Sequence, residues 1–285
     1  NDLDSSISLE GLSRIRINAY ISREKRCLTL RILPDDVPDW RDLGLPQPYI
    51  NLAKLHRGMI LCTGPTGSGK STSLAAMINY MLETQKRHIL TIEDPIEFQF
   101  QHSKNCIIHQ REVKRDTQSF ATALRAALRE DPDVIYIGEM RDLETIQLAI
   151  TAAETGHLVL GTLHTSSAAK TVERIIDVFP ADQQEQARLQ VSTSLAGIMS
   201  QTLCKNTKGK RSLAYELMIN TNAIGNLIRE RKVSQIYSQL QTSQSDGMNT
   251  LEQCLIDLVQ KGLITKEQAY DKASNAKALA ELEQQ

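Results

Sequence analysis

Gly64-Pro65-Thr66-Gly67-Ser68-Gly69-Lys70-Ser71 decides the fold of this chain, because it is a complete G-x-x-x-x-G-K-[ST] phosphate-binding loop. An apolar run, Met59–Cys62, precedes the loop, and a helix-like run, Ser73–Ile78, follows it. This setting favours a true phosphate loop over a glycine-rich turn before an ordinary helix. The glycines let backbone N–H groups turn around phosphates at the positive end of the next helix. We therefore expect nucleotide binding, with Lys70 supplying a positive charge and the Ser71 hydroxyl binding Mg²⁺.

Length and composition are those of an ordinary globular protein. The chain has 285 residues, enough for one large or two modest domains. It has 33 basic and 34 acidic residues, which argues against binding nucleic acid through a global positive field. No stretch approaches the ~18 apolar residues of a membrane span, so we expect membrane contact only through partners. The five cysteines are scattered without a C-x-x-C pair, which argues against a zinc site or a disulfide framework.

The pattern of apolar residues predicts an α/β fold with a mainly parallel sheet. From Gly58 onward, short apolar runs alternate with helical patterns, as in sheets covered by helices on both faces. After Ser166 the pattern becomes mainly helical. The predicted strands are Met59–Thr63, His88–Glu93, Cys106–Gln110, Val134–Gly138, His157–His164 and a pair near 200–204 and 213–219. The predicted helices are Ile50–His56, 70–84, 117–130, 142–155, 167–177, 182–200, 221–231, 233–242, 249–261 and 265–284.

The N-terminal segment has a different pattern. Residues 12–33 alternate apolar and polar positions, which predicts a β-hairpin with its turn near Ser22–Arg26. The segment 34–48 carries four prolines and is typical of a linker. No initiator Met or helix start opens the chain, so we expect it to begin within a larger domain. Five arginines decorate the hairpin: Arg14, Arg16, Arg23, Arg26 and Arg31.

Carboxylates follow two of the predicted strands at their carboxyl ends, where ligands bind in open α/β sheets. Glu93 ends the second strand, and Asp94 and Glu97 follow it. One of them would orient the attacking water or hold Mg²⁺ through water; the alternative is an acidic turn that caps the strand. Glu139 follows Val134–Gly138 in the Walker B arrangement, where a carboxylate serves the metal or polarises water.

The sequence leaves two interpretations open, functional or structural, for one histidine and for two groups of arginines. His164 ends the strand 157–164, where it would sense the γ-phosphate or serve as an ordinary structural histidine. Arginines can complete a phosphoryl-transfer site from a neighbouring subunit. The hairpin arginines and the pair Arg111 and Arg115 qualify, although a single arginine is more often a solvated surface charge.

Four ordered stretches resemble the Walker A, Asp box, Walker B and His box of the secretion ATPase superfamily, which powers type II secretion, type IV pili and related machines. They are Gly64–Ser71, Thr91–Glu97, Gly138–Asp142 and Gly161–Thr165. Only Cys204 and Cys254 follow His164, so the four-cysteine zinc module usual in the secretion and pilus-extension branches is missing. The chain therefore resembles the branch that retracts type IV pili, over 110–117, 139–146, 151–177 and 222–230.

The resemblance implies a homohexameric ATPase motor that hydrolyses ATP to power type IV pilus retraction. The alternatives are a secretion, conjugation or pilus-assembly ATPase of the same superfamily and an inactive regulatory subunit, which the intact boxes disfavour. The implied partners are an inner-membrane pilus platform protein and a paralogous retraction ATPase, without nucleic acid, at the cytoplasmic face of the inner membrane. The implied domains are a partial PAS-like lobe (1–33), a linker (34–48), a RecA-like ATPase core (49–220) and a helical C-terminal region (221–285).

The four boxes and the arginines together indicate which residues are expected to act on ATP and Mg²⁺. The catalytic set is Glu139, Glu97, His164 and Lys70. The nucleotide-binding set is Gly64, Pro65, Thr66, Gly67, Ser68, Gly69, Lys70, Ser71 and Thr72, with Arg14, Arg16, Arg31, Arg111 and Arg115. The metal-binding set is Ser71, Glu93, Asp94 and Glu139.

The segment Ala223–Glu230 resembles the retraction signature of the family, except that Gly225 stands where arginine is usual. Its apolar residues Leu227 and Ile228 are expected to couple hydrolysis to the pilus machinery. The alternative is an ordinary core helix.

Overall fold

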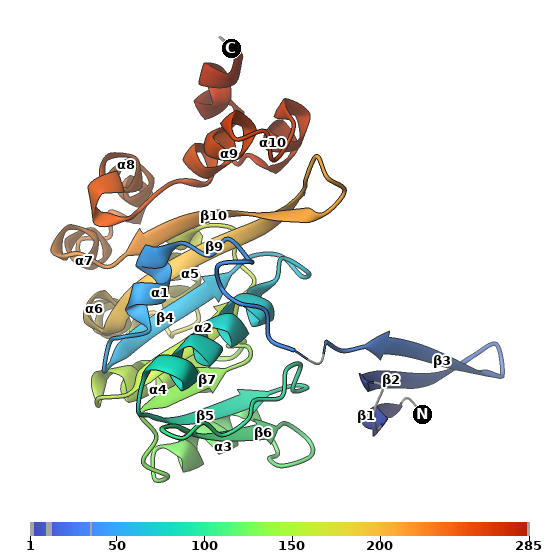
Figure 1. Cartoon of the computed structure of the whole chain (residues 1–285). Coiled ribbons are helices and arrows are strands. Elements are labelled where there is room, and N and C mark those ends of the chain that lie inside the picture. Colours follow the sequence, from blue (N-terminus) through green and yellow to red (C-terminus); the bar gives the residue numbers. More distant parts are fainter. Residues whose placement is uncertain (1–2, 10–12, 35, 284–285) are drawn as a thin grey trace.

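The computed structural model describes residues 3–9, 13–34 and 36–283. A small antiparallel sheet at the N-terminal end stands beside a larger α/β body, and short helices follow at the C-terminal end (Figure 1). This arrangement confirms the predicted α/β class. None of the described helices is long and apolar enough to cross a bilayer.

The small sheet contains the predicted hairpin. Its strands are ordered β1-β2-β3 and run antiparallel, with the hairpin turn at Arg23 and Glu24. Both turn residues have positive φ, 48° and 65°, as tight hairpins require. The first strand was not predicted. The bounds are Leu3–Leu9 (β1), Ser13–Ser22 (β2) and Lys25–Ile32 (β3).

The two faces of this sheet differ in chemistry. Along β3, Leu28, Leu30 and Ile32 are 59–71% exposed. Because successive side chains of a strand point to opposite faces, Arg31 lies on the other face, where Arg16 of β2 is its cross-strand partner. The alternation thus gathers two of the predicted phosphate-binding arginines on one face.

The large sheet has the order β10-β9-β4-β8-β7-β5-β6 in the described part of the chain. All neighbours pair in parallel except β10, which pairs antiparallel with β9 at one edge. The bounds are β4 (Gly58–Thr63), β5 (His88–Glu93), β6 (Ile107–Glu112), β7 (Val134–Ile137), β8 (Leu158–Leu163), β9 (Leu195–Lys205) and β10 (Arg211–Ile219).

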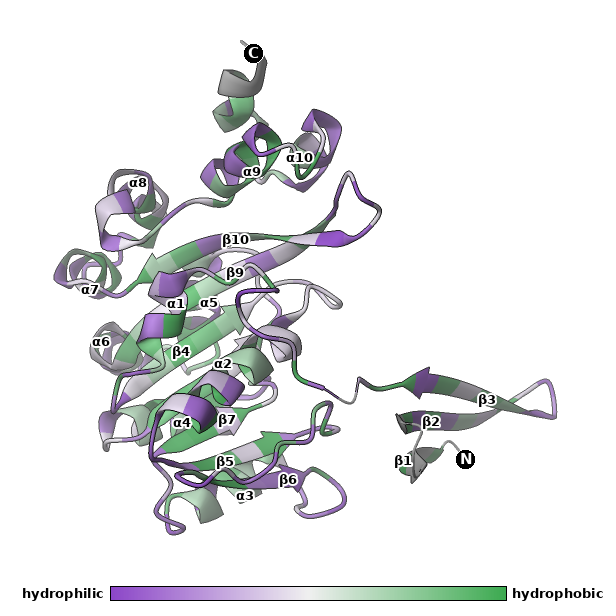
Figure 2. Cartoon of the chain, in the orientation of Figure 1, coloured by the Kyte–Doolittle hydropathy of each residue, from purple (hydrophilic) through white to green (hydrophobic). Residues whose placement is uncertain are grey.

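Helices cover both faces of the large sheet and bury its apolar strands (Figure 2). Residues of β4 alternate between the two cores: Met59 and Leu61 pack with α3 to α7, whereas Ile60 and Cys62 pack with α1 and α2. Burial on both faces explains the continuous apolar runs in the sequence. The bounds are α1 (Gln47–Leu52), α2 (Lys70–Thr84), α3 (Phe120–Ala127), α4 (Leu143–Glu154), α5 (Ala168–Asp177), α6 (Gln184–Ser194) and α7 (Asn222–Arg229).

A third, smaller core closes the C-terminal region. Leu255 and Leu258 of α9 pack with Cys204 of β9 and Ala214 of β10. Helices α9 and α10 therefore pack at the edge of the sheet formed by β9 and β10 (Figure 1). The bounds are α8 (Ile236–Thr242), α9 (Leu251–Gln260) and α10 (Lys266–Lys272), with 3₁₀ helices at Val233–Gln235, Gln244–Asp246 and Ala276–Glu283.

Several predicted helices were too long, and two of them were too long by six residues or more at the C-terminal end. The helix predicted over 182–200 ends at Ser194, and Leu195 begins β9. A short apolar run does not by itself distinguish a buried strand from a buried helix, and here pairing with β4 and β10 decides for the strand. The helix predicted over 265–284 ends at Lys272, because the next backbone N–H groups, of Ser274 and Asn275, donate to the Glu252 carboxylate.

Candidate functional site

The phosphate loop joins β4 to α2, and two of its glycines show why this residue type is needed. Gly69 caps α2 with φ 89°, a left-handed conformation that glycine adopts without strain. Gly64 has φ 142°, and a Cβ at this residue would collide with the carbonyl oxygen of Gln201 on β9. The loop is therefore shaped both by its own glycines and by the neighbouring strand.

Lys70 is the cation of the loop. Its Nζ donates to the carbonyl oxygens of Gly64 and Pro65, each at 3.0 Å. Burial lowers the pKa of Lys70, while the carboxylates of Glu139 and Glu97 act in the opposite direction. The buried ammonium is therefore held in position for the phosphates of a nucleotide.

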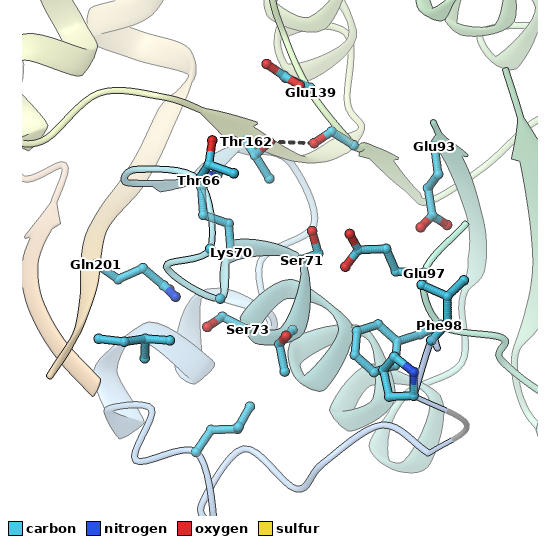
Figure 3. Close-up of a pocket in the computed structure, with 18 of the residues that line it drawn as sticks. Thr66, Lys70, Ser71, Ser73, Glu93, Glu97, Phe98, Glu139, Thr162 and Gln201 are labelled. Atoms are coloured by element: carbon cyan, nitrogen blue, oxygen red, sulfur yellow. Dashed lines mark hydrogen bonds between the residues drawn. The ribbon is translucent and has the colours of Figure 1, made fainter. Parts of the chain in front are cut away.

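A cavity of about 990 Å³ opens above the loop (Figure 3). It brings together segments that are far apart in the sequence: the loop, the carboxyl ends of β5, β7 and β8, and the hairpin between β9 and β10. Of the predicted site residues, those that line it are Arg16, Arg31, Thr66, Gly67, Gly69, Lys70, Ser71, Thr72, Glu93, Asp94, Glu97, Glu139 and His164. Gly64, Pro65, Ser68, Arg111 and Arg115 do not line it.

In the close-up, the carboxylate oxygens of Glu97 point toward Ser71 of the loop (Figure 3). Glu93 is buried and accepts hydrogen bonds from Thr91 Oγ1 at 2.6 Å and Gln110 Nε2 at 3.1 Å. Burial raises the pKa of Glu93 to about 7, against the effect of these hydrogen bonds. Glu93 and Glu97 are therefore in different environments, and of these two Glu97 is the one placed for chemistry at Ser71.

Glu139 is paired with two other side chains. Its Oε1 lies 2.9 Å from His164 Nε2, and its Oε2 lies 2.5 Å from Arg141 Nη2. The hydrogen bond with Glu139 raises the pKa of Arg141. The Walker B carboxylate and the His-box histidine thus form a direct pair across the ends of β7 and β8.

The predicted arginines fall into two groups. Arg16 and Arg31 line the cavity of their own chain. Arg111 instead pairs with Glu130 at 3.2 Å, and Arg115 is exposed outside the cavity. The side chain of Arg14 lies outside the described residues.

Comparison with known proteins agrees with this geometry. A family model described as Type II/IV secretion system protein matches residues 6–277. The chain belongs to this family. It is 54% identical to the Pseudomonas aeruginosa protein named Type IV pilus retractation ATPase PilT, over 95% of this chain and 79% of that protein. It is 52% identical to a Neisseria gonorrhoeae twitching motility protein, over 98% of this chain and 75% of that protein.

A solved structure has the same fold. The pilus retraction motor PilT with bound ADP superimposes with a TM-score of 0.93 at 51% identity. The match covers 98% of this chain and 80% of that one. The agreement extends over both the small sheet and the α/β body.

Several residues that line the cavity were not identified by the sequence analysis. Tyr136 is buried on β7, where burial raises its pKa well above the usual value and a hydrogen bond with Ser71 opposes that rise. Thr162 Oγ1 donates to the Gly138 carbonyl at 2.5 Å and ties β8 to the end of β7. Gln201 contacts the phosphate loop from β9. The available signal was a polar residue within each apolar run, but it did not indicate which face the residue occupies.

The segment that resembles the family's retraction signature forms α7, and its apolar side packs in the core. Ile228 is fully buried and Leu227 is half-buried against the same core. A Cβ on Gly225 would lie 3.2 Å from the Ser192 carbonyl oxygen and 3.6 Å from Arg229 Nη1. The surface that α7 offers a partner therefore consists of its exposed polar positions and Ala223, and the expectation that Ile228 contacts the machinery conflicts with its burial.

Proposed function

We propose that this secretion-family protein hydrolyses ATP to ADP and phosphate and uses the energy to retract a type IV pilus. The observation that carries the proposal is a complete phosphate loop whose Lys70 and Ser71 share one cavity with Glu97. Identity above 50% to proteins named for pilus retraction and twitching motility supports the pilus as the load.

The side chains around the loop fit Mg²⁺ bound together with ATP. Among the described residues, no three His, Cys, Asp or Glu side chains converge into a metal site. Mg²⁺ does not need such a cage, since it usually keeps several waters and takes one or two protein groups plus the substrate phosphates. Ser71 would be its direct protein ligand, with Glu97 placed to act through water. When bound, the ion neutralises charge on the β- and γ-phosphates.

Each side chain has a separate role in this proposal. Lys70 binds the β- and γ-phosphates, and Glu97 orients the attacking water and accepts its proton. Arg16 and Arg31 stabilise the charge that develops on the phosphates. The pair of Glu139 and His164 links the ends of two strands that border the γ-phosphate position, so it is placed to respond to the nucleotide state.

The remaining arginines support a ring of identical subunits. Arg111 and Arg115 lie outside their own cavity, so they would reach a nucleotide only from a neighbouring subunit. We take the ring to be a hexamer at the cytoplasmic face of the inner membrane, working on a pilus platform protein. Similarity to proteins named for pilus retraction supports the pilus as the assembly on which the protein acts.

The first experiment measures steady-state phosphate release from Mg²⁺-ATP. The parent protein should turn over ATP and Lys70→Ala should not, because no other lysine of the loop can replace the lost charge. Lys104→Ala, an exposed change outside the cavity, is the matched control and should retain the parent rate. Turnover by Lys70→Ala near the parent rate would overturn the assignment of the active site.

The second experiment identifies the direction of the motor in cells. Cells that lack this protein should carry abundant pili that no longer retract, and the parent gene should restore retraction while Lys70→Ala should not. Cells without pili would instead assign the protein to pilus assembly, the alternative within the same family.

A further inference from the structure

Gln201 of β9 lies on the side of the phosphate loop opposite Glu93 and Glu97 (Figure 3). Its side chain is 3% exposed. The amide nitrogen Nε2 donates to the Ser68 carbonyl oxygen at 2.6 Å, and the amide oxygen Oε1 accepts from the Cys62 thiol at 3.0 Å. One side chain therefore joins the end of β4 to the middle of the loop.

These partners define the orientation of the amide. The Ser68 carbonyl oxygen is only an acceptor, so the amide nitrogen must face it. An oxygen in its place would put two acceptors at hydrogen-bonding distance in a buried site, which is unfavourable. The contact consequently depends on an N–H donor at this position.

The backbone and side chain of Gln201 also lie close to Gly64 and Gly69 of the loop. A Cβ on Gly64 would collide with the Gln201 carbonyl oxygen, and a Cβ on Gly69 would lie 3.2 Å from Nε2. The neighbouring buried pair, Thr63 Oγ1 with Ser200 Oγ at 2.7 Å, joins the same two strands without touching the loop. Gln201 is thus the point at which β9 meets the loop itself.

We propose that Gln201 is a positioning residue that holds the phosphate loop in its nucleotide-binding shape by donating to Ser68. The proposal rests on the proposed nucleotide function. It goes beyond the sequence motifs, because Gln201 lies 133 residues from Ser68 in the chain. Gln201 acts through the loop backbone, so its loss weakens nucleotide binding without removing a group from the reaction.

The test is the affinity for Mg²⁺-ADP, measured by calorimetry on the full chain from about pH 6 to about pH 8. Gln201→Glu keeps the size of the side chain. Its protonated carboxyl can donate to Ser68, whereas its ionised carboxylate cannot. Relative to the parent at each pH, the affinity of Gln201→Glu should be about tenfold or more lower wherever the new carboxyl is ionised. Gln201→Met, which lacks a donor, should bind about tenfold more weakly at every pH.

Ser200→Ala is the matched control, because it removes a buried contact between the same strands one residue away. It should lower thermal stability and leave Mg²⁺-ADP affinity within about twofold of the parent. If Gln201→Met folds poorly, Gln201→Leu, which also lacks a donor, takes its place. Affinities of both Gln201 variants within about twofold of a parent that binds nucleotide would overturn the proposal. A parent that binds no nucleotide would overturn the proposed function instead.

Discussion

Glu216 makes a quantitative prediction about stability and pH. This carboxyl on β10 is 6% exposed, and its Oε1 accepts from the Ala168 N–H at the start of α5 at 2.7 Å. Burial raises the pKa of Glu216 from 4.5 to about 7; the hydrogen bond from Ala168 opposes the rise, and nearby Glu252 adds to it. The native state therefore holds a proton that the unfolded chain has already lost between these two pH values.

The sign follows from proton linkage. A group whose pKa is raised in the native state stabilises the protein at low pH, and this contribution is lost as the pH rises through the native pKa. The difference between 4.5 and about 7 corresponds to about 3 kcal/mol, at about 1.4 kcal/mol per pH unit. Glu216→Gln keeps an acceptor for Ala168 and removes the titration. The variant should match the parent near pH 4.5 and exceed its stability by up to about 3 kcal/mol near pH 8.

The assay is equilibrium unfolding in urea at a series of pH values and one protein concentration. In thermal scans the same difference corresponds to about 6–12 °C near pH 8. Glu93 titrates over the same range in both proteins, so its contribution cancels in the comparison. Glu173→Gln, an exposed change on α5, is the control and should follow the parent. If the free energies of unfolding of Glu216→Gln and the parent change in parallel with pH, the reasoning is refuted.

Two further predictions concern the site and α7. Glu97→Gln should retain ATP affinity while slowing single-turnover hydrolysis by orders of magnitude, because Glu97 points toward Ser71; a larger loss in Glu139→Gln would assign the base to Glu139. Ile228→Ala should lower the free energy of unfolding by about 2–5 kcal/mol, because Ile228 is fully buried, whereas the exposed change Glu230→Ala should leave it nearly unchanged in urea titrations. A stable Ile228→Ala protein would show that this side of α7 is free for a partner.

The fold class was predictable because local patterns carry it. Apolar runs covered on both faces, separated by helical periods, require a parallel sheet between helices. The errors in secondary structure occurred where one sequence pattern is compatible with two structures. Residues 195–199 form a short apolar run that suits a helix or a buried strand, and only pairing with β4 and β10 makes them part of β9.

The candidate site was predictable in its parts but not in its connections. The phosphate loop is a contiguous motif whose backbone geometry depends on its own glycines, so Lys70 and Ser71 were identified directly. Glu97 and Glu139 followed from their places after apolar strands. Their different surroundings did not follow, since Glu139 is paired with His164 only because β7 and β8 are neighbours in the sheet.

By itself, the sequence determined that this protein has a phosphate loop on an α/β sheet, with carboxylates and a histidine at the strand ends. Those features are encoded within short stretches, where backbone preference and side-chain period act over a few residues. Only the tertiary structure decided that Gln201 supports the loop, that Arg16 and Arg31 line the cavity, and that Ile228 belongs to the core. Each of these depends on contacts between segments far apart in the chain, which strand order and burial create and local sequence does not record.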